Sequence, residues 1–197
     1  MRTFIGIDFD IELKKKIRDL QSIVRENSQK GRFKYIGNFH LTLKFLGDIT
    51  IEEVPIINQV LENSAHKIGR FQLKVNKIGF FGGGSTIRTL WLGLGGDLEP
   101  LNSLYEEIED GLGNLGYKRE KRPYTPHITI AQDLLMKIDF KQLEKLIDLS
   151  TIPIIDVNEI CLIKSEQIKG KRVYTPLSTY RLMGNGKNNE TKVKGGF

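Results

Sequence analysis

Hydrophobic positions recur in two different periods along the chain. Residues 10–28 and 99–113 repeat apolar residues every three to four positions, which predicts amphipathic helices. Shorter apolar or alternating segments between Gly, Pro and Asp predict strands. The mixture indicates the α+β or α/β class. The predicted strands are 2–8, 32–36, 40–46, 70–81, 87–94, 127–131, 152–164 and 173–182, joined by helices 10–28, 50–65, 99–113 and a short one after Asp139.

Two predicted strands begin with the same pattern, His-apolar-Thr-apolar. These tetrads are 40–43 and 127–130, and each is followed by a turn and a short helix. We interpret the repeat as an internal duplication. A pseudo-twofold axis between the two halves would bring the tetrads face to face across a groove.

The alternation of a strand gives each tetrad a chemical face. His40 and Thr42 share one side, His127 and Thr129 share one side, and the apolar residues point into a core. With an unperturbed pKa near ~6.5, one imidazole can take a proton from water while the other gives one to a leaving alkoxide. The hydroxyls can donate hydrogen bonds to phosphate oxygens. One such tetrad is a weak pattern, but two in matched contexts predict phosphoester chemistry.

A zinc site formed by the two histidines is the main alternative. It needs a third and usually a fourth ligand, and no Cys, His or acidic cluster lies near either tetrad at a usual spacing. We therefore expect no metal and no cofactor. The third histidine, His66, is interpreted as a surface residue or a helix C-terminal cap, and the single cysteine, Cys161, as a core residue in a reducing compartment.

Composition adds little to this picture. The net charge of +6 agrees with RNA as a partner but is weak support alone. The N-terminus lacks the pattern of a signal peptide, and no segment approaches the ~20 apolar residues of a membrane span, so we expect a cytoplasmic protein. We expect one bilobed domain over 1–183 and a flexible, polar, glycine-rich tail over 184–197.

In these residues the chain resembles the RNA 2′,3′-cyclic phosphodiesterases of the 2H phosphoesterase superfamily, also called the 2′-5′ RNA ligase family. The resemblance implies a bilobed, duplicated α+β fold with two antiparallel sheets flanking a central cleft and helices outside. It also implies metal-independent hydrolysis of RNA 2′,3′-cyclic phosphate ends to 2′-phosphomonoesters, and we expect a monomer. The segments that carry it are 2–8, 40–47, 90–94, 122–131 and 174–177.

The resemblance also implies a role for each tetrad residue. By this likeness His40 is the proton donor to the leaving 3′-oxygen, and His127 is the proton acceptor that activates water. Thr42 and Thr129 hold the phosphate. Some relatives also join or split 2′-5′ linkages in tRNA halves, so a 2′-5′ RNA ligase or nuclease is one alternative. A non-catalytic RNA-binding module is another, although the intact tetrads argue against it.

Three residues near the tetrads are candidates for substrate binding. Gln132 stands where relatives often carry an arginine, and an amide can only hydrogen-bond a phosphate. By strand alternation Lys44 falls on the face of His40 and could bind phosphate, or it is a solvated lysine. Phe45 falls on the opposite face, so the core is its default position; in relatives an aromatic residue here lies near the terminal base.

The segment before the second tetrad is basic. Arg122, together with Arg119 and Lys121, could steer a phosphate backbone, or could form a solvated loop. Tyr124 could line the cleft or pack the turn.

Overall fold

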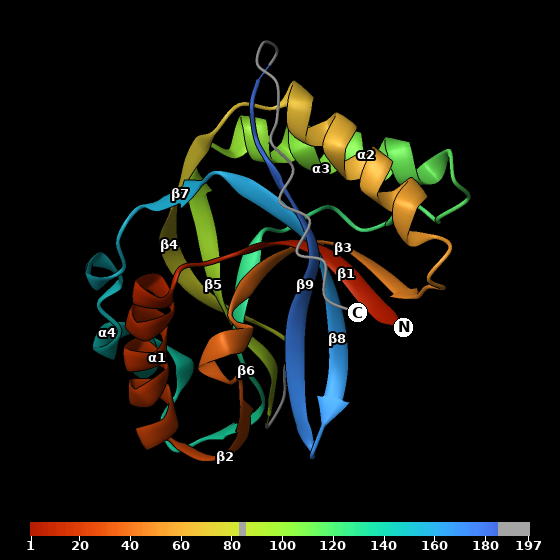
Figure 1. Cartoon of the computed structure of the whole chain (residues 1–197). Helices are drawn as coiled ribbons and strands as arrows, with labels where there is room; N and C mark the ends of the chain where they lie inside the picture. The colour runs from red at the N-terminus through yellow and green to blue at the C-terminus, as the bar shows by residue number, and fades with distance from the viewer. Residues whose placement is uncertain (83–85, 185–197) are drawn as a thin grey trace.

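The structure is a computed structural model, and it describes residues 1–82 and 86–184. Its strands form two antiparallel sheets, and helices cover the outer faces of the sheets (Figure 1). The α+β prediction is therefore confirmed. The predicted tail at 184–197 lies outside the described residues apart from Gly184, and the predicted turn at 82–85 lies mostly outside them.

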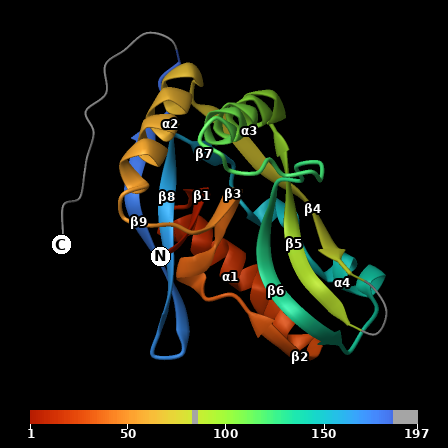
Figure 2. The same cartoon turned by 90° about the vertical axis from the view of Figure 1, so that its right-hand side faces the viewer.

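The first sheet carries the first tetrad on its edge strand. Its strand order is β3-β1-β8-β9. Because β3 is at the edge, its free side turns toward the second sheet, where β3 and β6 lie side by side at the centre of the molecule (Figure 2). The strands are β1 (Arg2–Asp8), β3 (His40–Asp48), β8 (Glu159–Ile168) and β9 (Lys171–Arg181).

The second sheet carries the second tetrad on its second strand. Its order is β2-β6-β5-β4-β7. The hairpin of β4 and β5 predicted from the sequence is present. The strands are β2 (Ser28–Phe33), β4 (Phe71–Phe81), β5 (Ile87–Gly96), β6 (His127–Met136) and β7 (Ile155–Val157).

Helices pack on both sheets through the apolar stripes predicted from the sequence. The helix α1 contacts β2 and β6, α2 contacts β8 and β9, and α3 contacts β3, β4 and α2. Among the described residues no helix is long and apolar enough to cross a membrane. The helices are α1 (Ile11–Glu26), α2 (Val54–Lys67), α3 (Leu98–Gly113) and α4 (Phe140–Leu146), with short 3₁₀ turns η1 (Ile36–Asn38) and η2 (Leu149–Thr151).

Three predicted elements differ from the structure. The strand predicted at 32–36 lies instead at Ser28–Phe33, and Ile36 begins η1. The strand predicted at 152–164 is two strands in different sheets, because β7 pairs with β4 while β8 pairs with β1. The helix predicted from Thr50 begins at Val54. The Glu53 carboxylate does accept a hydrogen bond from the Thr50 N–H at 2.7 Å, as in a capping box, but the residues between them form a turn rather than helix.

Candidate active site

Both tetrads alternate as predicted. Leu41, Ile128 and Ile130 are fully buried, whereas the histidines and threonines on the other face keep partial exposure. Each imidazole and hydroxyl is therefore supported by a strand whose opposite face is anchored in the hydrophobic core. Such support holds side chains more accurately than a loop does.

The two tetrads lie on neighbouring strands of different sheets. Cα atoms of β3 and β6 come within 8 Å of one another. The segment that leads into the second tetrad also touches the first, because the Tyr124 hydroxyl donates a hydrogen bond to the Thr42 carbonyl at 3.1 Å. The Tyr124 ring stacks on Tyr105 of α3 with a centroid distance of 4.2 Å. Tyr124 therefore packs the turn and ties the two motifs together.

The same backbone contact orients both imidazoles. Nδ1 of His40 lies 2.8 Å from the Asn38 carbonyl, and Nδ1 of His127 lies 2.7 Å from the Thr125 carbonyl. A carbonyl oxygen can only accept, so Nδ1 carries a proton in each ring and Nε2 is the atom that exchanges one. In His40 the neutral Nε2 accepts a hydrogen bond from the Thr42 hydroxyl at 2.9 Å. For His127 we find no such partner of Nε2 among residues 1–82 and 86–184.

Aromatic rings flank each imidazole. Phe4 lies 4.6 Å from the His40 ring and Tyr174 meets it edge-on at 5.1 Å. Phe81 meets the His127 ring edge-on at 5.2 Å, with Trp91 at 6.0 Å. These rings help to remove water from the imidazoles.

Burial lowers the pKa of both histidines. For His40 desolvation lowers the pKa to about 4; the carbonyl of Asn38 opposes this shift and the positive charge of Lys34 adds to it. Desolvation also lowers the pKa of His127. Without substrate, both rings are therefore neutral at pH 7.

The alternation predicted for β3 is wrong beyond Leu43. Thr42 pairs with Gly6 and Lys44 pairs with Ile5, so Leu43 is an extra residue that forms a β-bulge. The bulge turns Lys44 inward, where its ammonium lies 2.7 Å from Oε1 and 2.9 Å from Oε2 of Glu109 on α3. Phe45 is turned outward and is 70% exposed. Lys44 thus does not share the face of His40, and Phe45 is not in the core.

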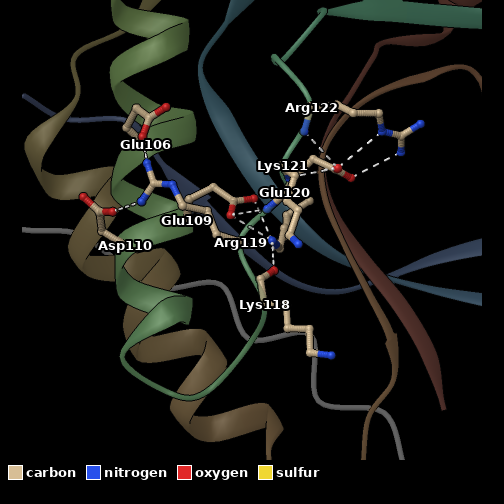
Figure 3. A network of polar contacts seen from close by, with 9 residues as sticks. Glu106, Glu109, Asp110, Lys118, Arg119, Glu120, Lys121 and Arg122 are labelled. Carbon is tan, nitrogen blue, oxygen red and sulfur yellow. Dashed lines mark hydrogen bonds and ion pairs between the residues drawn. The ribbon is translucent and has the colours of Figure 1, made fainter.

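Two arginines of the basic segment before the second tetrad pair with acidic side chains. Arg119 reaches both Glu106 and Asp110 of α3, and Arg122 lies 3.3 Å from Glu120 (Figure 3). The charge of Arg119 is thus compensated within the fold. The Arg122 side chain is 85% exposed, so its pairing with Glu120 is a solvent-screened surface contact.

A groove that the sequence did not predict adjoins His40. Phe4, Phe45 and Tyr174 line it, and Gln132 reaches it from β6. Arg32 on β2 is the register partner of Gln132 on β6. A guanidinium therefore lies on the strand next to Gln132, the position where an arginine was expected from the resemblance. We refer to this surface as the basic groove. No group of three or more His, Cys, Asp or Glu side chains is placed to hold a metal ion in the described part of the chain.

Comparison with known proteins gives the family of the chain. Residues 9–169 match the family model described as the 2′-5′ RNA ligase superfamily. The chain belongs to the 2′-5′ RNA ligase superfamily. The likeness seen in the sequence is thus confirmed.

Relatives within this superfamily carry the name RNA 2′,3′-cyclic phosphodiesterase. The protein of Thermotoga maritima is 30% identical over 157 residues, which cover 75% of this chain and 83% of the relative. That of Methanocaldococcus jannaschii is 34% identical over 133 residues, covering 67% and 71%. Among solved structures, E. coli LigT without ligand matches with a TM-score of 0.70 and 26% identity over 93% of this chain and 98% of LigT.

Proposed function

We propose that this protein hydrolyses RNA 2′,3′-cyclic phosphate ends to 2′-phosphomonoesters by metal-independent acid–base chemistry. The observation that carries the proposal is the matched pair of imidazoles on β3 and β6, each with Nδ1 bound to a backbone carbonyl and Nε2 left to exchange a proton. The names of the relatives from Thermotoga maritima and Methanocaldococcus jannaschii support the choice of substrate.

The proposed reaction needs two proton transfers and one displacement at phosphorus. Nε2 of His127 takes a proton from water as the water oxygen bonds to phosphorus. The bond from phosphorus to the 3′-oxygen breaks, and Nε2–H of His40 gives its proton to that oxygen. The products are a free 3′-hydroxyl and a 2′-phosphomonoester. Each transfer is worth about 10²–10⁴-fold in rate.

The low pKa of His40 sets a condition on this assignment. A proton donor must be charged, and the free site disfavours that charge. The cyclic phosphodiester carries one negative charge, and a neighbouring negative charge raises the pKa of an imidazole. We therefore propose that substrate and proton bind His40 together.

Protonation of His40 also changes what Thr42 can do. While Nε2 of His40 is unprotonated, its lone pair accepts the hydrogen bond of the Thr42 hydroxyl at 2.9 Å, so that proton is not free for the substrate. Once Nε2 carries a proton, it no longer accepts, and the hydroxyl proton is released to a non-bridging phosphate oxygen. Thr129 supplies the second hydroxyl. Losing one such donor typically costs roughly 10²–10³-fold.

Substitution of each histidine tests the proposal. His40→Ala and His127→Ala should each lower kcat/KM on a nucleoside 2′,3′-cyclic phosphate by about 10²–10⁴-fold in the presence of chelator. His66→Ala is the matched control, since His66 lies in the last turn of α2, and should retain full activity. Full activity of either tetrad variant would overturn the proposal.

A substrate with sulfur in place of the 3′-oxygen separates the two roles. A thiolate leaves without protonation, so the loss in His40→Ala should largely disappear on this substrate while the loss in His127→Ala should persist. The opposite pattern would exchange the roles.

Ligation is the second candidate, favoured by the family description itself. It is the same displacement at the same two imidazoles, with a 5′-hydroxyl in place of water as the attacking group. Incubation with RNA halves bearing a cyclic phosphate and a 5′-hydroxyl distinguishes the two. A 2′-phosphate product identifies the hydrolase, and a 2′-5′ linked product identifies the ligase.

A further inference from the structure

The basic groove beside His40 has an unusual charge. It encloses about 1150 Å³, and seven of the residues that line it are Lys or Arg while none is Asp or Glu. Its walls come from α1, β1, β2, β3, β6, η1 and the β8–β9 hairpin, most of which are far apart in the sequence. The fold thus gathers positive charge from separate segments onto one surface.

Most of this charge is not compensated within the protein. Arg18 pairs with Asp19, and Arg32 pairs with Asp133 at 2.5 Å. No carboxylate of the described residues lies within 4.0 Å of the other five: Arg2, Arg25, Lys34, Lys171 and Arg172. The contrast with the segment 118–122 is clear, because Arg119 and Arg122 there are held by acidic partners.

Lys34 is the most constrained of these cations. Desolvation lowers its pKa, and the charges of Arg32 and Arg172 lower it further. The β9 hairpin is held at this place, because Asn38 donates a side-chain hydrogen bond to the Arg172 carbonyl at 2.9 Å. Mutual repulsion of these cations destabilises the empty groove, and an anion would relieve it.

Exposed aromatic rings accompany the cations. Tyr35 is 68% exposed and Phe45 is 70% exposed, and both line the groove. Cations that follow a phosphate backbone, combined with rings on which bases stack, are typical of surfaces that bind single-stranded nucleic acid. A groove built for a lone phosphate ion would need no such rings.

We propose that the basic groove binds the RNA strand on the 5′ side of the cyclic phosphate. Lys34 and Arg172 contact a backbone phosphate upstream of the reacting one, and a base stacks on Tyr35. The groove adjoins the reacting end because Phe4 and Tyr174, which flank His40, also line it. This inference rests on the proposed function and adds that the preferred substrate is an oligonucleotide rather than a mononucleotide.

Binding tests the groove without requiring catalysis. The probe is a fluorescent RNA of about eight nucleotides with a 2′-phosphate end, followed by anisotropy over a range of salt concentrations. Lys34→Gln/Arg172→Gln should bind it about tenfold more weakly at low salt. The slope of log K against log[salt] should fall by roughly 0.7, since the two cations neutralise one phosphate and each neutralised phosphate of a single strand contributes about 0.7. The matched control removes two exposed lysines outside the groove, Lys16→Gln/Lys145→Gln, and should bind like the wild type.

A second variant tests the stacking and does not depend on the first. Tyr35→Ala removes a ring that is already 68% exposed, so the fold should tolerate it. It should weaken binding about tenfold with the salt slope unchanged.

Hydrolysis then links the groove to the reaction. In Lys34→Gln/Arg172→Gln the ratio of kcat/KM on an oligonucleotide cyclic phosphate to that on a nucleoside cyclic phosphate should fall about tenfold. If this variant binds RNA like Lys16→Gln/Lys145→Gln, the groove inference is wrong, even where both substrates are hydrolysed. If the wild type hydrolyses neither substrate, the proposed function is wrong, and the binding arm still decides the groove.

Discussion

Lys44→Met should destabilise the fold and leave nucleotide binding intact. The Lys44 side chain is 8% exposed and the Glu109 side chain is fully buried. The lysine ammonium also donates to the Lys118 carbonyl at 2.7 Å. Of its two contacts with Glu109, the one to Oε2 is an aligned hydrogen bond, whereas the one to Oε1 is an ion-pair contact. Methionine fills the space but leaves the carboxylate buried without its cation.

The size of the loss follows from this burial. Removing one partner of a buried ion pair costs about 3–5 kcal/mol, whereas replacing both partners by apolar residues is often close to neutral. Lys44→Met/Glu109→Met should therefore regain most of the stability lost in Lys44→Met. Lys67→Met is the matched control, because Lys67 pairs with Glu107 of the same helix α3 but is 56% exposed. It should cost about 0–1 kcal/mol.

Urea unfolding followed by circular dichroism measures these losses, and steady-state kinetics on a nucleoside 2′,3′-cyclic phosphate measures KM. The buried-pair explanation predicts a lower unfolding midpoint in Lys44→Met with KM unchanged at a temperature where the variant is folded. A variant of normal stability with a KM raised several-fold would show instead that the ammonium binds phosphate, and would refute the reasoning.

Three further predictions concern the site itself. Because burial lowers the pKa of both tetrad histidines, kcat/KM should peak on the acid side of the usual imidazole value of 6.5. The bound phosphodiester raises the pKa of His40, so kcat should peak at higher pH than kcat/KM; coincident peaks would contradict this. Phe45→Ala should raise KM by the factor that corresponds to the ~1–3 kcal/mol of one base stack, without lowering the urea midpoint. Phe45→Trp should restore the wild-type KM. Tyr124→Phe should lose about 0.5–1.5 kcal/mol of stability with its hydrogen bond to Thr42, and kcat should fall while KM changes little, if this bond positions β3.

Local periodicity was sufficient to predict most of the elements and both tetrads. The apolar stripe of α1 and the alternation of His40–Leu43 and His127–Ile130 are properties of contiguous residues, and each was found as predicted. The two strands were then expected to approach one another through the repeat, and β3 and β6 are neighbours in space.

Features that depend on pairing between strands were not predictable in this way. The bulge at Leu43 exists because the register between β3 and β1 shifts at this point, and the segment Leu43-Lys44-Phe45 has no sequence pattern that predicts the shift. The burial of Lys44 then depends on its ion pair with Glu109, which lies on α3 and is distant in the sequence. The basic groove could not be predicted from any single segment either, since its cations come from segments that only the fold brings together.

The carbonyl contact at each Nδ1 makes the reactive tautomer a property of the main chain. Asn38 and Thr125 supply only their peptide oxygens to these bonds, and every amino acid has one. Exchange of either side chain therefore leaves the proton inventory of the imidazoles untouched. Substitutions at these two positions should retain the reactive tautomer of both imidazoles as long as the path of the backbone is kept.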